Sequence, residues 1–147
     1  MALLFHPEPG TVLMCDFDKL GLKEPEMVKM RPAVVISPRL KRRDDLLTLV
    51  PLSTTAPTTV MPYQIRIEIV PRLPRPWDAQ FVWVKADMIY TVRFDRLELI
   101  RTGRDHTGKR QYITQNLSKD QIYEIHKCLL NGLGLSAVGL SALTNYL

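Results

Sequence analysis

Short apolar runs separated by polar loops recur along most of the chain, and this pattern predicts a protein built mainly from β-strands. Residues 33–37 (AVVIS) form a β-branched run that suits a central strand. Residues 63–69 (YQIRIEI) alternate polar and apolar positions, as a strand with one solvated face does. Similar runs predict further strands over 11–17, 46–52, 80–86, 87–92 and 96–100. About five to seven strands of this kind favour a small barrel or a strongly bent sheet.

A helix is predicted near the C-terminal end. Ser118 and Gln121 have the spacing of a capping box, in which two residues satisfy each other's main-chain N–H groups. Apolar residues then recur at helical spacing on one face, at Ile122, Ile125 and Leu129. A glycine at 132 or 134 would end the helix. The expected fold class is therefore mainly β, of the α+β kind, with a C-terminal helix.

The chain length points to one compact domain. A length of 147 residues is close to the commonest domain size, and 46% apolar residues can fill a core. We expect this domain over 1–135 and a tail of small residues over 136–147. The formal charge of +5 mildly favours a polyanionic partner. Cys15 and Cys128 lack CxxC spacing, so we expect two buried, reduced thiols and a cytoplasmic protein.

Residues 128–147 contain no charge, and their length would just span a bilayer. They include two asparagines, three glycines, two serines and a threonine, so we interpret them as a helix end followed by a tail. The N-terminus lacks the basic region of a signal peptide. No membrane association is expected.

Several classes of chemistry lack their motifs. The three histidines are scattered, so no metal site is expected, and the Asp16/Asp18 pair suits a turn. The sequence has no GxSxG elbow of a serine hydrolase and no phosphate-binding GxGxxG or GxxxxGK[ST] loop. No cofactor is therefore expected.

Polar residues at strand edges form the strongest candidate site. Arg31 enters the second predicted strand, and Ser53 follows the third. If these strands pair antiparallel, the start of one meets the end of the other, which brings Arg31 near Ser53. Glu26 lies in the loop before Arg31. The pattern fits a catalytic pair, but composition alone favours a salt bridge with hydroxyls that cap a loop.

Four motifs in order resemble landmarks of the PemK/MazF family of type II toxin–antitoxin toxins: PGTVLMCDFD, EMVKMRPAVVIS, VPLSTT and ADMIYTVRFDRL. The resemblance spans residues 9–135. It implies a compact SH3-like barrel with a C-terminal helix. It also implies a homodimeric, metal-independent endoribonuclease that cuts single-stranded RNA at short sequences. The implied partner is a cognate acidic antitoxin, partly disordered until it binds.

By this resemblance Arg31 matches the catalytic arginine of the family and Glu26 its acidic partner. Ser53 stands where the family usually has a threonine, and Thr54 matches the hydroxyl residue that follows. Met88 replaces a glutamine. The implied reaction is attack by the RNA 2′-OH, which gives a 2′,3′-cyclic phosphate and a 5′-OH. Glu26 would act either as the base or as the group that orients Arg31.

RNA contacts are expected from basic loops and from residues near the end of a strand. The residues proposed for this role are Arg39, Arg42, Arg43, Arg75, Trp77, Lys85 and Asp87. Trp77 and Trp83 each suit base stacking or a place in the core. Two alternatives to the nuclease remain at this point. One is a non-catalytic poison that binds DNA gyrase, as in the similar CcdB family, and the other is an inactive barrel that serves as an adaptor.

Overall fold

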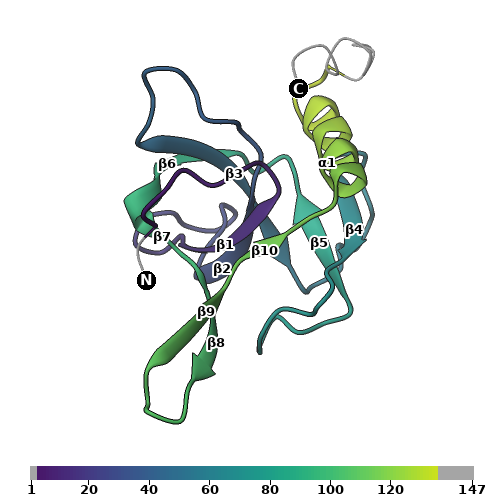
Figure 1. Ribbon diagram of the computed structural model, residues 1–147. Helices are drawn as coiled ribbons and strands as arrows, with labels where there is room; N and C mark the ends of the chain where they lie inside the picture. The colour runs from purple at the N-terminus through teal and green to yellow at the C-terminus, as the bar shows by residue number, and fades with distance from the viewer. Residues whose placement is uncertain (1–2, 136–147) are drawn as a thin grey trace.

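The computed structural model describes residues 3–135, in which a curled half-barrel sheet packs against one C-terminal helix (Figure 1). The sheet has eight strands in the order β10-β1-β2-β3-β5-β4, with β6 paired to β3 and β7 paired to β1. Its strands are β1 (Thr11–Asp16), β2 (Met30–Val35), β3 (Leu46–Ser53), β4 (Gln64–Glu68), β5 (Phe81–Lys85), β6 (Tyr90–Arg93), β7 (Leu97–Glu98) and β10 (Gln115–Asn116). A 3₁₀ turn (Phe94–Arg96) lies between β6 and β7. The mainly β prediction is confirmed.

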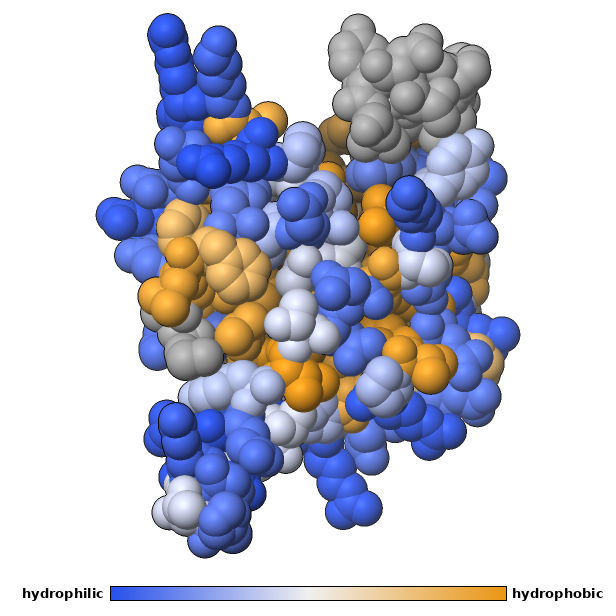
Figure 2. Space-filling view, viewed as in Figure 1, coloured by the Kyte–Doolittle hydropathy of each residue, from blue (hydrophilic) through white to orange (hydrophobic). Residues whose placement is uncertain are grey.

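A separate hairpin, β8 (Ile100–Arg104) paired with β9 (Arg110–Ile113), projects from the half-barrel (Figure 1). It contains the basic residues Arg101, Arg104, Lys109 and Arg110. Figure 2 shows this hairpin and the loop between β2 and β3 as two hydrophilic projections. Both projections are solvated because they have little apolar surface to bury.

Two apolar clusters cover opposite faces of the sheet. The first includes Val34 and Val50 and lies between the sheet and α1 (Lys119–Gly132). The second includes Ala33 and Val35, and residues of the β1–β2 loop such as Phe17 pack into it. Because side chains alternate along a strand, buried runs such as AVV supply both clusters at once. This explains why the sequence shows continuous apolar runs.

The helix begins as the sequence predicts. Gln121 N donates to Ser118 Oγ at 3.1 Å, and Ser118 N donates to Gln121 Oε1 at 3.0 Å, which completes the capping box. Ile125 and Leu129 are buried against the sheet. At the other end, a Cβ on Gly132 would lie 3.3 Å from the Cα of Asp87, so glycine allows the helix to pack closely on the β5–β6 turn. The tail predicted over 136–147 lies outside the described residues.

Candidate active site

The guanidinium of Arg31 is held by the main chain. Arg31 is the second residue of β2, and its Nε donates to the carbonyl oxygen of Val28 at 2.8 Å. The side chain is partly buried. Because the bond uses Nε, an approaching anion would meet the fork formed by the two terminal nitrogens. That fork can bind two phosphate oxygens at once.

Cys15 lies beside Arg31 across the β1–β2 ladder and is fully buried. Burial, reinforced by the nearby negative charge of Asp16, raises the pKa of the Cys15 thiol to about 12. The thiol is therefore neutral near pH 7. It places no counter-charge beside the arginine.

Ser53, the last residue of β3, lies at the end of β3 that meets the start of β2, where Arg31 stands. The β2–β3 ladder ends with the pair Ala33 and Pro51, and the same register continued two residues further would set Arg31 opposite Ser53. Pro32 and Pro51 have no N–H to donate, which limits ladder bonds between the two strands at this end. Residues opposite each other in an antiparallel pair point to the same face. The sequence-based expectation that the start of β2 meets the end of β3 is confirmed.

The Ser53 side chain is buried, with 4% of its surface exposed. Its Oγ accepts a hydrogen bond from Thr55 N at 3.1 Å. A hydroxyl can accept one bond and donate another, so the Ser53 proton remains suited to a phosphate oxygen. Thr54 is exposed in the bend that follows.

Glu26 is exposed in the β1–β2 loop and contacts its own loop. Its Oε1 accepts from Lys23 N at 3.2 Å, and its main-chain N donates to Lys23 O at 2.8 Å. Across residues 3–135 the ion pairs do not include one between Glu26 and Arg31. The group that orients Arg31 in this structure is the Val28 carbonyl.

Two side chains fix the loop that leads into β2. Asp18 Oδ1 accepts from Lys29 N at 2.7 Å, and the hydroxyl of Tyr90 accepts from Met27 N at 3.1 Å. The Tyr90 ring also packs on Phe17, with ring centroids 5.1 Å apart. Lys29 has a positive φ of 69°, a conformation that side-chain-bearing residues rarely adopt. These bonds hold the loop that leads into β2 and Arg31. The predicted turn at Asp16/Asp18 is also present, and Lys19 N donates to Asp16 Oδ1 there at 3.1 Å.

The other predicted RNA contacts lie at different places. Lys85 ends β5, opposite Gln64, on the side of the sheet near Ser53. Asp87 is exposed in the following turn, with its Cα near Gly132. Trp77 is partly buried and packs against the first apolar cluster. Of this group, Lys85 is the residue that the ladder connects most closely to the candidate site.

Each of the predicted basic loops has an exposed ion pair, and the β2–β3 loop lies away from Arg31. The β2–β3 loop with Arg39, Arg42 and Arg43 leaves the far end of β2, about 13 Å along the strand from Arg31 at 3.3 Å per residue. Arg39 forms an ion pair with Asp44 at 2.8 Å, and this bond lowers the pKa of the Asp44 carboxyl. Arg75 pairs with Asp78 at 3.7 Å. Both ion pairs are exposed and therefore weak, so an RNA phosphate that binds either arginine would displace only a weak interaction with its carboxylate.

Sequence reasoning missed the groups that position the site. Val28 contributes a main-chain oxygen, which no side-chain pattern reveals. Tyr90 is distant in sequence from the loop that it holds. The period-two pattern of the β5 strand could have shown that Trp83 faces away from the buried Val82 and Val84.

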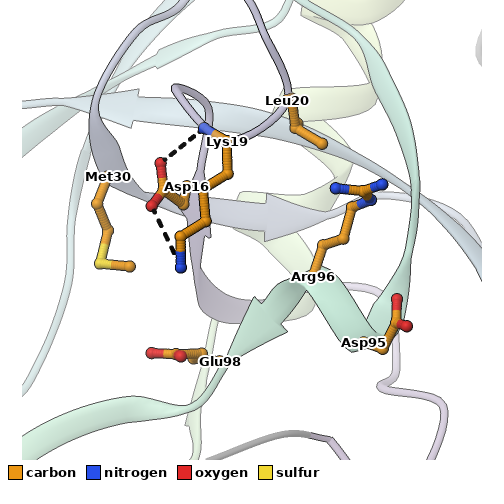
Figure 3. Close-up of a pocket in the computed structure, with 7 residues that line it drawn as sticks. All are labelled: Asp16, Lys19, Leu20, Met30, Asp95, Arg96 and Glu98. Carbon is orange, nitrogen blue, oxygen red and sulfur yellow. Dashed lines mark hydrogen bonds and ion pairs between the residues drawn. The ribbon is translucent and has the colours of Figure 1, made fainter.

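A pocket of about 200 Å³ opens beside the start of β2, and Figure 3 shows its lining. Met30 and Asp16 form one ladder pair there, so they face the side opposite to Arg31 and Cys15. The lining has three carboxylates, Asp16, Asp95 and Glu98, against two cations, Lys19 and Arg96. Lys19 interacts with Asp16 through both its N–H, at 3.1 Å, and its Nζ, at 3.9 Å (Figure 3). An acidic pocket repels phosphate, so it is not part of the candidate site.

Within residues 3–135, no group of three or more His, Cys, Asp or Glu side chains is arranged to hold a metal ion. No helix there has the length and apolar character needed to cross a membrane.

Comparison with known proteins identifies the family. The model of PemK-like, MazF-like toxins of type II toxin–antitoxin systems matches residues 8–133, so the chain belongs to this family. The uncharacterized protein YifN of Escherichia coli (strain K12) is 26% identical over 150 residues, which cover 90% of this chain and 95% of YifN.

Solved structures share the fold. An endoribonuclease in complex with its cognate antitoxin, from a mycobacterial species, has a TM-score of 0.56 and 23% identity over 88% of this chain and 97% of its own. The Mycobacterium tuberculosis toxin MazF-mt6 has a TM-score of 0.56 and 17% identity over 87% and 98%, respectively. At these identities the likeness supports the half-barrel with its C-terminal helix.

Proposed function

We propose that this toxin-family protein is a sequence-specific endoribonuclease that cuts single-stranded RNA, including mRNA, without a metal ion. The observation that supports this most is that Val28 O orients Arg31 at the start of β2, the end that the β2–β3 ladder brings toward the end of β3, where Ser53 lies. A fixed cation beside a hydroxyl donor suits a phosphate that gains negative charge during reaction. Membership of the toxin family agrees with this activity, and so does the similar fold of a mycobacterial endoribonuclease.

In the proposed reaction, the 2′-oxygen of the RNA attacks the adjacent phosphorus and forms a new P–O bond. The bond from phosphorus to the 5′-oxygen breaks, and that oxygen takes a proton from solvent and leaves as a 5′-OH, which balances the proton that the base removes from the 2′-OH. The other product is a 2′,3′-cyclic phosphate. DNA has no 2′-OH and would not react.

Each site residue has a defined role in this proposal. Arg31 binds the non-bridging phosphate oxygens and stabilises the charge of the transition state. Ser53 donates its hydroxyl proton to one of these oxygens, and the exposed Thr54 offers a second hydroxyl. Since Val28 already orients Arg31, we assign Glu26 the role of the base that accepts the 2′-OH proton.

The proposed partners are an acidic antitoxin and a second copy of this chain. A solved structure of similar fold is described as an endoribonuclease in complex with its cognate antitoxin. A net charge of +5 suits an acidic segment that competes with RNA for the same surface. The homodimer is proposed by resemblance to the family.

Incubation with a long single-stranded RNA in EDTA, beside a DNA of the same sequence, tests the activity. The expected result is cleavage of RNA alone, with a 2′,3′-cyclic phosphate and a 5′-OH at each cut. An intact RNA would contradict the proposal. Inhibition of DNA gyrase by such an inactive protein would instead support a CcdB-like poison, and RNA binding without cleavage would support an adaptor.

A further inference from the structure

The projecting β8–β9 hairpin presents three arginine side chains on one face. Its ladder pairs Arg101 with Tyr112 and Arg104 with Arg110, and a bulge between Arg101 and Gly103 shifts the register between them. One further ladder pair separates these two, and side chains change face from each pair to the next. Paired residues share a face, so the three arginines lie together on the same side of the hairpin.

The other face of the hairpin is anchored in the core. Ile100, at the start of β8, is 2% exposed and belongs to the first apolar cluster, and its ladder partner Ile113 packs on the same cluster. The pair that contains Arg101 comes next and points to the opposite side. All three arginines are exposed, and Figure 2 shows the hairpin as a hydrophilic projection. The arginine face is therefore open to a ligand.

The three guanidinium groups have no ion-pair partner among residues 3–135. The adjacent carboxylate, Asp105, is engaged in the turn, where its Oδ1 accepts from Thr107 N at 2.8 Å, from Thr107 Oγ1 at 2.6 Å and from Lys109 N at 3.0 Å. Arg104 and Arg110 lie directly opposite each other, and like charges in that relation destabilise a β-ladder. An anion bound between them would remove this repulsion.

Main-chain bonds order the end of the hairpin. Arg104 Nη1 donates to the carbonyl oxygen of Gly108 at 2.8 Å, and Gly108 N donates to the carbonyl oxygen of Asp105 at 3.0 Å. Gly108 has a φ of 85°, which glycine adopts without strain. A carbonyl group thus orients Arg104 without neutralising it. A ligand would meet a pre-oriented cation, which lowers the entropic cost of binding.

We propose that Arg101, Arg104 and Arg110, here called the hairpin arginines, bind the phosphate backbone of RNA outside the stretch that reacts at Arg31. This inference rests on the proposed function, because it adds a second contact for the same substrate. A guanidinium fork binds two phosphate oxygens at once. Phosphate contacts carry no sequence information, so the hairpin arginines add affinity and leave the choice of the cut to the candidate active site.

The hairpin is close enough to the candidate active site for one RNA to reach both. Cys15 pairs with Arg31 on β2 and with Leu97 on β7, so the Cα atoms of Arg31 and Leu97 are two strand spacings, about 10 Å, apart. The chain then leads away from the level of Arg31, and from Leu97 to Arg104 it extends by at most about 25 Å. A long RNA can span this distance, whereas a short RNA that fills only the site at Arg31 cannot.

The chemistry of the hairpin favours RNA over an acidic protein. The core of a protein interface is depleted in charge and enriched in aromatic side chains. Residues 101–111 contain no large apolar residue. An acidic protein segment would therefore find positive charge here and no apolar anchor, while a phosphate backbone needs the charge alone.

Salt-dependent binding of a fluorescein-labelled, mixed-sequence RNA of about 30 nucleotides tests the proposal, with 2′-O-methyl sugars so that the RNA binds without being cut. Each phosphate contact contributes about 0.7 to the slope of log K against log salt for a single strand, so Arg104→Gln/Arg110→Gln should reduce that slope by about 1.4. Its Kd should rise, and the ratio of its Kd to that of wild type should shrink roughly 7-fold between about 50 mM and about 200 mM salt. Arg104→Lys/Arg110→Lys retains both charges and should keep the wild-type slope.

Lys119→Gln/Lys127→Gln on α1 is the matched control, because it removes two exposed cations from another part of the molecule. The slope and the Kd of this control should stay near wild type. Arg110→Gln alone keeps the bond from Arg104 to Gly108 and removes the repulsion between opposite arginines, so its melting temperature should not fall while its Kd rises. Equal slopes for the double hairpin variant and wild type, or an equal loss in the α1 control, would overturn the proposal.

RNA length separates the hairpin from the candidate active site. A mixed-sequence RNA of about 6 nucleotides should bind wild type and Arg104→Gln/Arg110→Gln equally. With long unmodified RNA, this variant should raise KM and leave kcat within a few-fold of wild type. An equal loss for short and long RNA would contradict a contact outside the reacting stretch. Binding of polyglutamate or duplex DNA that depends on the hairpin arginines, while RNA binding does not, would also overturn the proposal.

The same data distinguish the two proposals. If wild type binds long RNA through the hairpin arginines but does not cut it, the proposed nuclease fails and the hairpin contact stands. If wild type cuts RNA and the hairpin variants bind long RNA with the wild-type slope, the nuclease stands and the hairpin contact is wrong.

Discussion

Arg31 Nε and the carbonyl oxygen of Val28 lie 2.8 Å apart, so a main-chain group three residues earlier orients the arginine. A carbonyl carries no net charge, and it therefore fixes the direction of the guanidinium without neutralising it. A carboxylate in the same place would reduce the attraction of Arg31 for a phosphate. This relationship makes Glu26 free for another role, which defines the first prediction.

Glu26→Gln should lower the single-turnover rate of RNA cleavage by about 10²- to 10⁴-fold, the usual contribution of a general base. Glutamine keeps an oxygen that can accept from Lys23 N, so the loop and the RNA affinity should stay close to wild type. Glu24→Gln is the matched control, because Glu24 is an exposed carboxylate of the same loop. Equal rates for the two variants would contradict the base role of Glu26.

Ser53→Thr and Ser53→Ala test the hydroxyl opposite Arg31. Threonine keeps the hydroxyl and should cleave RNA within a few-fold of wild type. Alanine removes both the acceptor for Thr55 N and the proposed donor to phosphate, so we expect a loss of about 10²-fold or more in rate and about 1 kcal/mol in unfolding free energy. Rate measurements and denaturant melts check this. A fully active Ser53→Ala protein would rule out the donor role.

Tyr90→Phe tests whether the loop before β2 positions the site. The ring and its packing on Phe17 are kept, and the hydroxyl that accepts from Met27 N is lost. We expect the unfolding free energy to fall by about 1 kcal/mol and kcat to fall several-fold while the RNA Kd changes little. Tyr112→Phe on the hairpin is the control. A loss of stability without any change in kcat would show that the bond is structural alone.

The strands and the helix follow from features that the sequence displays directly. The runs that contain Val34 and Ile67 became strands because their β-branched and alternating residues fit a pleated sheet, and Ser118 with Gln121 formed the capping box. The β8–β9 hairpin also forms where a basic glycine-containing segment precedes an apolar one.

The contacts that set the site were harder to predict. The sequence placed Arg31 and Ser53 at neighbouring strand ends, and the register agrees. It suggested Glu26 as one possible orienter, whereas the structure uses Val28, because main-chain bonds depend on loop conformation rather than on residue type. The basic composition of the loops also suggested cations such as Arg39 as RNA contacts. Arg39 lies beyond the other end of β2 from Arg31.

The stability of the fold should depend on the thiol of Cys15 at high pH. Its ordinary pKa of 9.0 is raised to about 12 by burial in the folded protein. Between these values the unfolded chain has lost a proton that the folded chain keeps, so stability falls as pH rises, with a slope of up to about 1.4 kcal/mol per pH unit. Denaturant melts of wild type and Cys15→Ala from pH 8 to about pH 11 should show a flatter dependence for the variant. Parallel curves would contradict this.

The most direct test of the account is the single-turnover rate of RNA cleavage in EDTA by wild type, Arg31→Lys and Arg31→Ala. Lys119→Ala serves as the control, because Lys119 is exposed at the start of α1, on the opposite side of the sheet. The account predicts a loss of about 10²- to 10³-fold or more for Arg31→Ala, as removal of a preorganised donor causes, with RNA affinity changed far less. Arg31→Lys should recover little, since an ammonium lacks both the planar fork and the Nε–H bonded to Val28. Cleavage by Arg31→Ala at the wild-type rate would contradict the central claim.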